Sequence, residues 1–148
     1  MEFLSKSLED TKRFAEEFVE KLSKSSNSGA TVVGLYGNLG SGKTTFVQGV
    51  AGILGVKEHL TSPTFVILKR FQINDLRFKF ENLVHIDAYR LKSGEELRKL
   101  GFDDLFRDSR NLILIEWADL VADILPPNHI KLKFEFVGEQ TRKITYGF

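Results

Sequence analysis

The chain has 148 residues, of which 42% are hydrophobic, and this suits one ordered globular domain with a sizeable core. Its 21 Lys and Arg residues nearly balance its 20 Asp and Glu residues, so the formal charge of +1 excludes a strong general attraction to nucleic acid or anionic membrane. It has no cysteine, which excludes disulfides and thiolate metal sites. The N-terminus lacks the pattern of a signal peptide and no apolar run approaches a membrane span, so we expect a cytoplasmic protein without membrane contact.

Hydrophobic periodicity divides the N-terminal part of the chain into helix, strand and helix. Ser7 and Asp10 resemble a capping box, and apolar residues follow them at helical spacing. Gly55 is placed to cap the second helix. The elements expected here are a helix over residues 7–23, a Ser- and Gly-rich loop over 24–29, a buried strand over 32–36 and a helix over 43–54.

The segment from Gly37 to Thr44, G-N-L-G-S-G-K-T, is the most specific motif in the sequence. It matches G-x-x-x-x-G-K-[ST] between a predicted strand and a predicted helix, the context that a phosphate-binding loop requires. Lys43 is expected to reach the β- and γ-phosphates, and the Thr44 hydroxyl to ligate Mg²⁺. The alternative is a glycine-rich turn that only joins the two elements. The residues expected around the nucleotide are Asn38, Leu39, Gly40, Ser41, Gly42, Lys43, Thr44 and Thr45.

Strand-like segments dominate the rest of the chain. Pro63 excludes helix from the polar turn before a strand expected to run to about Phe71. Leu76 to Phe80 alternate with basic residues after a turn at residues 74–75, which predicts a hairpin. The remaining expected elements are a buried strand over 82–90, a short helix after Ser93, a helical turn over 103–106, a buried parallel strand over 112–115, a short helix before Pro126, and antiparallel strands over 130–137 and 141–146 joined at Gly138.

The order of these elements predicts the fold class. Strands alternate with helices early in the chain and form a hairpin late, which is typical of α/β proteins. We therefore predict a three-layer α/β sandwich like that of P-loop NTPases, with a mainly parallel central sheet and antiparallel edge strands. Residues 1–148 are expected to form a single domain of this kind.

Two carboxylates follow predicted buried strands, at the strand ends where ligands bind in open α/β sheets. Glu116 directly follows Leu-Ile-Leu-Ile, the Walker B arrangement that presents an acid to Mg²⁺, and Asp87 ends the strand H-I-D. The alternatives are an ordinary surface or capping acid for Glu116 and a turn-capping role for Asp87. Phosphoryl transfer needs a positioned metal and a group that orients water, and two acids can divide these tasks. We therefore predict Lys43, Asp87 and Glu116 as catalytic residues, and Thr44 and Glu116 as metal ligands.

Several neighbouring residues have two interpretations each. His85 is favoured as a hydrogen-bonded core histidine rather than as a catalytic residue. Trp117 is favoured as a packed core aromatic rather than as a lid over the nucleotide site. Arg90 suits phosphate neutralisation and pairing with an acid equally well. Residues 62–64 either form a nucleotide-sensing switch or a plain turn. The Lys, Arg and Phe residues of 69–80 suit an RNA-facing hairpin, but a hairpin that buries its phenylalanines explains them more simply.

With these motifs assembled, the chain resembles the TsaE (YjeE) family of bacterial ATPases that act in tRNA threonylcarbamoyladenosine modification. The resemblance rests on four blocks in the family's order, G-N-L-G-S-G-K-T-T at 37–45, S-P-T-F at 62–65, H-I-D-A-Y-R-L at 85–91 and I-E-W at 115–117. The late Arg142 also looks like the family. The combination spans nearly the whole chain and is far more specific than the phosphate-binding loop alone.

The resemblance implies an ATP-hydrolysing accessory to the TsaD–TsaB complex, which transfers a threonylcarbamoyl group to an adenosine in certain tRNAs. It implies ATP and Mg²⁺ as cofactors, and contact with tRNA indirectly through the complex. Carried onto this sequence, Lys43 would hold phosphates, Thr44 and Glu116 would bind Mg²⁺, and Asp87 would assist hydrolysis.

The resemblance also implies a switch at residues 62–65 and an approach of Thr11 to the adenosine end of the nucleotide. One departure is Asn38, where the family commonly has Asp. An amide can neither take a proton nor neutralise Mg²⁺ as a carboxylate does. If that Asp takes part in hydrolysis in the family, turnover here is slower or differently arranged.

Two other functions stay open. A small-molecule kinase shares the phosphate-binding loop, although the sequence has no convincing arginine-bearing lid. A nucleotide-gated binding module with incidental hydrolysis would also carry the same motifs. A GTPase is disfavoured because no N-K-x-D motif occurs. The main hypothesis is a Mg²⁺-dependent ATPase, slow alone and stimulated by partners.

Overall fold

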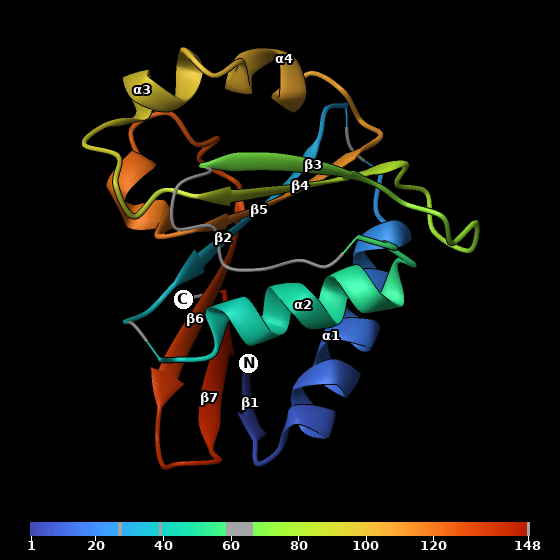
Figure 1. The fold of residues 1–148 in the computed structure, drawn as a ribbon, viewed down its shortest axis with the longest axis vertical. Helices are drawn as coiled ribbons and strands as arrows, with labels where there is room; N and C mark the ends of the chain where they lie inside the picture. The colour runs from blue at the N-terminus through green and yellow to red at the C-terminus, as the bar shows by residue number, and fades with distance from the viewer. Residues whose placement is uncertain (27, 39, 59–66, 148) are drawn as a thin grey trace.

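A mixed sheet of seven strands forms the centre of the structure (Figure 1), a computed structural model that describes residues 1–26, 28–38, 40–58 and 67–147. The strands are β1 (Glu2–Ser5), β2 (Thr31–Tyr36), β3 (Leu68–Gln72), β4 (Asn82–Asp87), β5 (Asn111–Glu116), β6 (Ile130–Phe136) and β7 (Arg142–Tyr146). Their order across the sheet is β1-β7-β6-β2-β5-β4-β3. β6, β2, β5 and β4 are parallel, and the strands at both edges are antiparallel to their neighbours. The predicted α/β class is confirmed.

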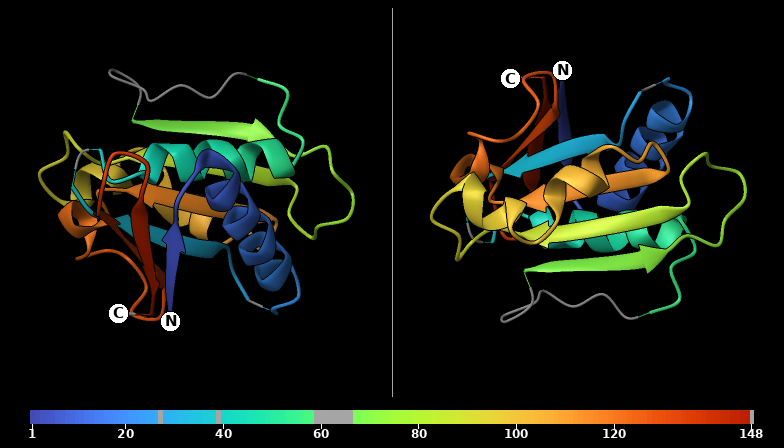
Figure 2. Two further views of the ribbon diagram at one scale, coloured as in Figure 1. Left: turned by 90° about the horizontal axis from the view of Figure 1, so that it is seen from below. Right: turned by 90° about the horizontal axis from the view of Figure 1, so that it is seen from above.

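Helices cover both faces of this sheet, as the views in Figures 1 and 2 show. The helical elements are α1 (Leu8–Ser23), α2 (Lys43–Ile53), α3 (Gly94–Arg98), α4 (Phe102–Phe106) and the 3-10 turn η1 (Ala118–Val121). α1 and α2 pack on one face against strand residues such as Leu83 and Leu114. α3, α4 and η1 pack on the other face against Val84 and Ile113. The two cores separate because successive residues of a strand point to opposite faces.

The caps that the sequence predicted are present at α1 and α2. The Ser7 hydroxyl accepts a hydrogen bond from Asp10 N at 3.1 Å, and the Asp10 carboxylate accepts one from Lys6 N at 2.9 Å. At the end of α2, Gly55 has a φ of +72° and donates to the Gly52 carbonyl at 3.2 Å. These local hydrogen bonds satisfy backbone groups that the helix ends leave unpaired.

The predicted strand over residues 76–80 is wrong. This segment is a loop, and β3 instead forms its hairpin with β4. The loop turns where Asp75 accepts hydrogen bonds from the backbone N–H and guanidinium of Arg77. Phe78 and Phe80 are buried in the core beneath α1 and α2, so the simpler interpretation of these phenylalanines is confirmed. Alternation therefore predicted burial correctly for Phe78 and Phe80 but not for the exposed Leu76, and it did not mark a strand.

β1 is a strand that the sequence did not predict. Its four residues are too few for an alternating pattern to stand out, yet they pair antiparallel with β7, and the Phe3 ring stacks on Phe14 at 5.0 Å between centroids. β1 rather than β7 therefore forms that edge of the sheet.

The strand predicted over residues 82–90 is shorter in the structure, where β4 ends at Asp87. The expected switch at residues 62–65 lies outside the described residues.

None of the helices in the described part of the chain has both the length and the apolar character needed to cross a bilayer.

Gly94, the first residue of α3, provides a test of the packing between α3 and the segment after η1. A Cβ there would lie 2.4 Å from Ile124 Cγ2 and 2.8 Å from Asp123 Oδ1, the atom that accepts the Gly94 N–H. We expect Gly94→Ala to lower the free energy of unfolding by about 1–3 kcal/mol because the added methyl overpacks this contact. Urea unfolding followed by circular dichroism measures the change.

Gly52→Ala is the matched control. Gly52 lies in α2, and a Cβ there would meet no atom within 4 Å among the described residues. This variant is expected to raise the free energy of unfolding by about 0.5–1 kcal/mol, since alanine favours the helix. Equal effects of the two substitutions would contradict the packing described for α3.

Candidate functional site

The loop between β2 and α2 has a conformation that requires glycine at defined positions. Gly37 has a φ of +140°, and a Cβ on it would lie 2.3 Å from the carbonyl oxygen of Phe134 on β6. Gly42 has a φ of +104° and precedes the first residue of α2, with its carbonyl accepting from Phe46 N at 3.0 Å. The loop therefore packs its backbone directly against β6 and enters α2 in the left-handed region of φ, where side chains are strained.

This loop forms one wall of a pocket of about 850 Å³. The other walls come from the N-terminal segment, the ends of β4 and β5, and the turn between β6 and β7. The predicted site residues that line it are Thr11, Gly40, Ser41, Gly42, Lys43, Thr44, Thr45, Asp87 and Glu116. Asn38 is exposed and does not line it, and Leu39 lies outside the described residues. The volume is that of a typical small-molecule site.

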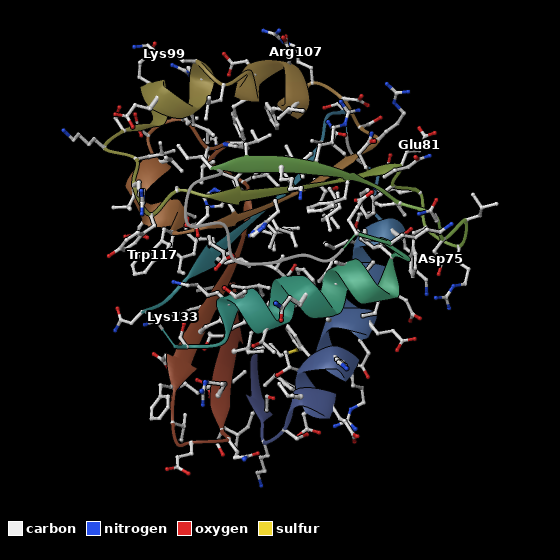
Figure 3. All side chains as sticks on the ribbon, viewed as in Figure 1. Asp75, Glu81, Lys99, Arg107, Trp117 and Lys133 are labelled. Atoms are coloured by element: carbon white, nitrogen blue, oxygen red, sulfur yellow. The ribbon has the colours of Figure 1, made fainter. Side chains whose placement is uncertain are left out.

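Lys43 is buried at the start of α2, and its ammonium group contacts both the glycine-rich loop and an aromatic ring. Its Nζ donates to the Gly37 carbonyl and lies 3.7 Å from the centroid of the Trp117 ring, labelled in Figure 3. Burial lowers the pKa of the Lys43 ammonium below its ordinary value, while Glu116, Asp119 and Asp87 act in the opposite direction. The lysine is thus desolvated but surrounded by groups that favour its charged form.

Glu116, at the end of β5, has hydrogen bonds on both carboxylate oxygens. The Thr44 hydroxyl donates to Oε1 at 3.0 Å, and Oε2 lies 2.6 Å from His85 Nε2. Only 3% of Glu116 and 1% of His85 are exposed. The interpretation of His85 as a buried, hydrogen-bonded histidine is confirmed, and its partner is a predicted site residue.

Asp87 lies beside Glu116, because the two residues are register partners in the parallel pair of β4 and β5. Its Oδ1 accepts a hydrogen bond from Tyr89 N at 3.0 Å, so Asp87 has the turn-capping role that the sequence left open as well as a place in the pocket. Burial raises the pKa of the Asp87 carboxyl above its ordinary value, and the charge of Glu116 adds to this rise. Its deprotonated form is therefore less favourable than that of an exposed aspartate.

Trp117 both packs at the edge of a core cluster and lines the pocket. Its φ of +59° makes it the one residue other than glycine with a positive φ in the described part of the chain. This backbone turn brings the ring against Tyr89, at 5.2 Å between centroids, and beneath the ammonium of Lys43. The sequence-based preference for a purely core aromatic is therefore incomplete.

Sequence reasoning missed several residues that line the pocket. Tyr89 stood within the H-I-D-A-Y-R block without an assigned role. Arg90, which the sequence suited equally to phosphate neutralisation and to pairing with an acid, lines the pocket as well. Arg142 was noted only as a likeness, but its Nε donates to the Gly40 carbonyl at 3.0 Å and its Nη1 to that of Gly138 at 2.6 Å. Arg142 therefore ties the turn between β6 and β7 to the glycine-rich loop. No local pattern in the sequence marked this contact.

The N-terminal segment forms the far end of the pocket. Thr11 is buried in α1, and its hydroxyl lies 2.7 Å from the Ser5 hydroxyl of β1. Ser7 and Leu8 line the same end. Neither Ser5 nor Ser7 had a predicted role in the site: Ser5 lies on β1, a strand that the sequence did not predict, and Ser7 was predicted only as the cap of α1.

The oxygen ligands at the other end fit Mg²⁺. The Thr44 hydroxyl and the Glu116 carboxylate are hard donors of the kind this ion prefers. No group of three or more histidine or acidic side chains that could hold a metal occurs within the described residues. Mg²⁺ is usually bound by one or two protein groups together with substrate phosphates, and Thr44 and Glu116 would be two such groups.

These features define the class: an α/β protein with a strand–glycine loop–helix motif that faces an acid from the adjacent parallel strand. A model of the family described as threonylcarbamoyl adenosine biosynthesis protein TsaE matches residues 5–144. The chain therefore belongs to the TsaE family, and the family predicted from its four sequence blocks is confirmed.

Individual relatives agree with this assignment. The tRNA threonylcarbamoyladenosine biosynthesis protein TsaE of Bacillus subtilis (strain 168) is 35% identical over 138 residues, which cover 93% of this chain and 79% of the relative. The protein of the same name from Treponema pallidum (strain Nichols) is 33% identical over 145 residues, 98% of each chain. The crystal structure of Bacillus subtilis YdiB is similar with a TM-score of 0.69 at 31% identity, covering 99% of this chain and 83% of that one.

Asp87→Asn tests the electrostatics of the pocket through stability. A raised pKa in the folded state means that the ionised carboxylate lowers stability at neutral pH, and that this loss vanishes as the pH falls below the unfolded-state pKa of about 4. Asparagine has no such charge and keeps an acceptor for Tyr89 N. We expect the melting temperature of Asp87→Asn to exceed that of the native chain by about 2 °C at neutral pH, with the advantage shrinking towards about pH 4. Calorimetry at both pH values measures it, and a variant less stable than the native chain at neutral pH would contradict it.

Proposed function

We propose that this chain is a Mg²⁺-dependent ATPase of tRNA threonylcarbamoyladenosine biosynthesis, an accessory to the TsaD–TsaB transferase built as one domain of the P-loop NTPase type, a three-layer sandwich. The observation that carries the proposal is the convergence of Lys43, Thr44 and Glu116 in one pocket, with the Thr44 hydroxyl 3.0 Å from the Glu116 carboxylate. Lys43 and Thr44 are the first residues of α2, directly after the glycine-rich loop, and Glu116 is the last residue of the neighbouring strand β5. This combination suits the phosphates of a nucleotide with its metal.

In this proposal the chain's residues bind and orient ATP. The backbone of the glycine-rich loop and the Lys43 ammonium hold the phosphates, and Lys43 leaves the Gly37 carbonyl to do so. Thr44 and Glu116 would hold Mg²⁺, which supplies neutralisation of the phosphate charge when bound. The Ser5–Thr11 end of the pocket and the turn carrying Arg142 would receive the nucleoside.

Asp87 is the group best suited to orient the attacking water and to accept its proton. It lies at the pocket beside Glu116, and its raised pKa makes it a stronger base than an exposed aspartate. Asn38 cannot share this task, because its amide takes no proton. It is also exposed and does not line the pocket. Hydrolysis that depends on Asp87 alone is consistent with a slow enzyme that partners stimulate.

The proposed partners follow from the family. The curated relatives are named for tRNA threonylcarbamoyladenosine biosynthesis, and this chain covers most of their length. The formal charge of +1 gives the chain no broad attraction for RNA, so tRNA is proposed to be met through the TsaD–TsaB complex.

The chain's single tryptophan offers a direct test of nucleotide binding. Trp117 lies under the Lys43 ammonium, so its fluorescence is expected to change when ATP draws Lys43 towards the phosphates. Lys43→Met is expected to weaken ATP binding by about 10- to 100-fold, the loss of one or two charge-assisted hydrogen bonds. Titration calorimetry gives the affinities.

Lys99→Met is the matched control, because Lys99 is exposed at the end of α3 and does not line the pocket (Figure 3). It should bind ATP as the native chain does. Equal losses in the two variants would indicate a general charge effect, and no loss in Lys43→Met would contradict the phosphate site.

Hydrolysis is tested by phosphate release with and without the TsaD–TsaB pair. Asp87→Asn is expected to lower the rate by about 100-fold or more while ATP binding persists, since it removes a general base but no phosphate contact. Absence of hydrolysis by the native chain under both conditions would contradict an ATPase. Loss of hydrolysis without loss of tRNA modification would instead indicate a nucleotide-gated binding module.

A further inference from the structure

His85 is a buried polar residue that the proposed chemistry does not use. It lies on β4 two residues before Asp87, so both side chains project from the same face of the strand, towards α2. Its register partner on β5 is Leu114, two register positions before the Asp87–Glu116 pair. His85 does not line the pocket, and with 1% of its surface exposed it has no route to a ligand.

The contact of His85 with Glu116 is short and directional. His85 Nε2 lies 2.6 Å from Glu116 Oε2, while Glu116 Oε1 accepts from the Thr44 hydroxyl at 3.0 Å. A buried carboxylate is unfavourable unless its oxygens receive hydrogen bonds, and an imidazole N–H supplies one. The two oxygens of Glu116 therefore face different partners: Oε2 faces the buried His85 on β4, and Oε1 faces Thr44 at the start of α2.

This arrangement restricts the position of a flexible side chain. Glutamate has three rotatable bonds, and a carboxylate held at one oxygen only would sample several orientations. The hydrogen bond from His85 leaves Glu116 one orientation in which Oε1 meets Thr44. Partners of this kind, behind a metal ligand, orient the ligand and contribute to metal affinity.

We infer that His85 is a positioning residue, which donates its Nε2–H to Glu116 Oε2 and thereby holds Oε1 beside Thr44 for a divalent cation. The inference rests on the proposed function, because it concerns the cation that Thr44 and Glu116 would hold there. His85 acts through Glu116 and contacts neither nucleotide nor cation.

Two substitutions of His85 separate its hydrogen bond from its volume. His85→Phe keeps a ring of similar size without a donor, and His85→Gln places an amide N–H close to the position of Nε2. With ADP saturating, Mn²⁺ binding followed by electron paramagnetic resonance is expected to weaken by about 10- to 100-fold in His85→Phe. His85→Gln should retain most of the native Mn²⁺ affinity, and both variants should bind ADP in EDTA as the native chain does.

Val84→Ala is the control for lost stability. Val84 precedes His85 on β4, is fully buried, and packs on the opposite face, away from the pocket. This variant should be destabilised without any change in Mn²⁺ affinity. Native Mn²⁺ affinity in His85→Phe, equal losses in the Phe and Gln variants, or an equal loss in Val84→Ala would each overturn the inference. A native chain that binds neither ADP nor Mn²⁺ would instead refute the proposed function itself, and the inference with it.

The proposed hydrogen bond from His85 can also be tested on the native chain, without relying on the folding of a variant. ¹⁵N NMR of the imidazole groups reports which ring nitrogen of His85 carries a proton. We expect a slowly exchanging proton on Nε2, since this nitrogen faces a buried carboxylate oxygen. An Nε2 without a proton would overturn the inference, because a bare nitrogen cannot donate to Glu116.

Discussion

The hydrogen bond between the Thr44 hydroxyl and the Glu116 carboxylate joins the two halves of the candidate site, and the other contacts depend on it. It is possible because β2 and β5 are adjacent and parallel, so that the loop after one strand and the last residue of the other meet at the same edge of the sheet. β4, parallel to β5 on its other side, adds Asp87 to that edge and places His85 behind Glu116. The strand order thus decides which side chains share the pocket.

The same pocket contains groups that are unfavourable for folding. Lys43 and Asp87 have pKa values shifted in the directions that burial imposes, and Trp117 has a backbone conformation rare for a side chain of its size. These groups are tolerated because they compensate one another through the Lys43–Trp117 contact and the acids around the ammonium. A site that concentrates such residues gives up stability for a prearranged set of charges.

Local physics explains which features were predictable. The start of α1 at Ser7 and the end of α2 at Gly55 follow from hydrogen bonds between residues a few positions apart. The loop and the acid at Glu116 were predictable because each depends on a short run of residue types. The strand expected over residues 76–80 failed, since alternating burial also arises in a loop that packs two phenylalanines. β1 was missed because a four-residue edge strand is stabilised by its pairing with β7, and its own pattern is too short to be recognised.

By itself, the sequence determined the α/β class, the family, the helix caps and the residue types of the phosphate-binding loop, because periodicity, capping and motif spacing act over short stretches of chain. Only the tertiary structure decided that His85 meets Glu116, 31 positions away, and that Arg142 reaches Gly40, 102 positions away. Such pairs depend on strand order and register, and no residue near either partner in the sequence carries information about the other. The apolar strand pattern predicted that His85 and Glu116 lie on buried strands, but only the register of β4 against β5 makes the two residues neighbours.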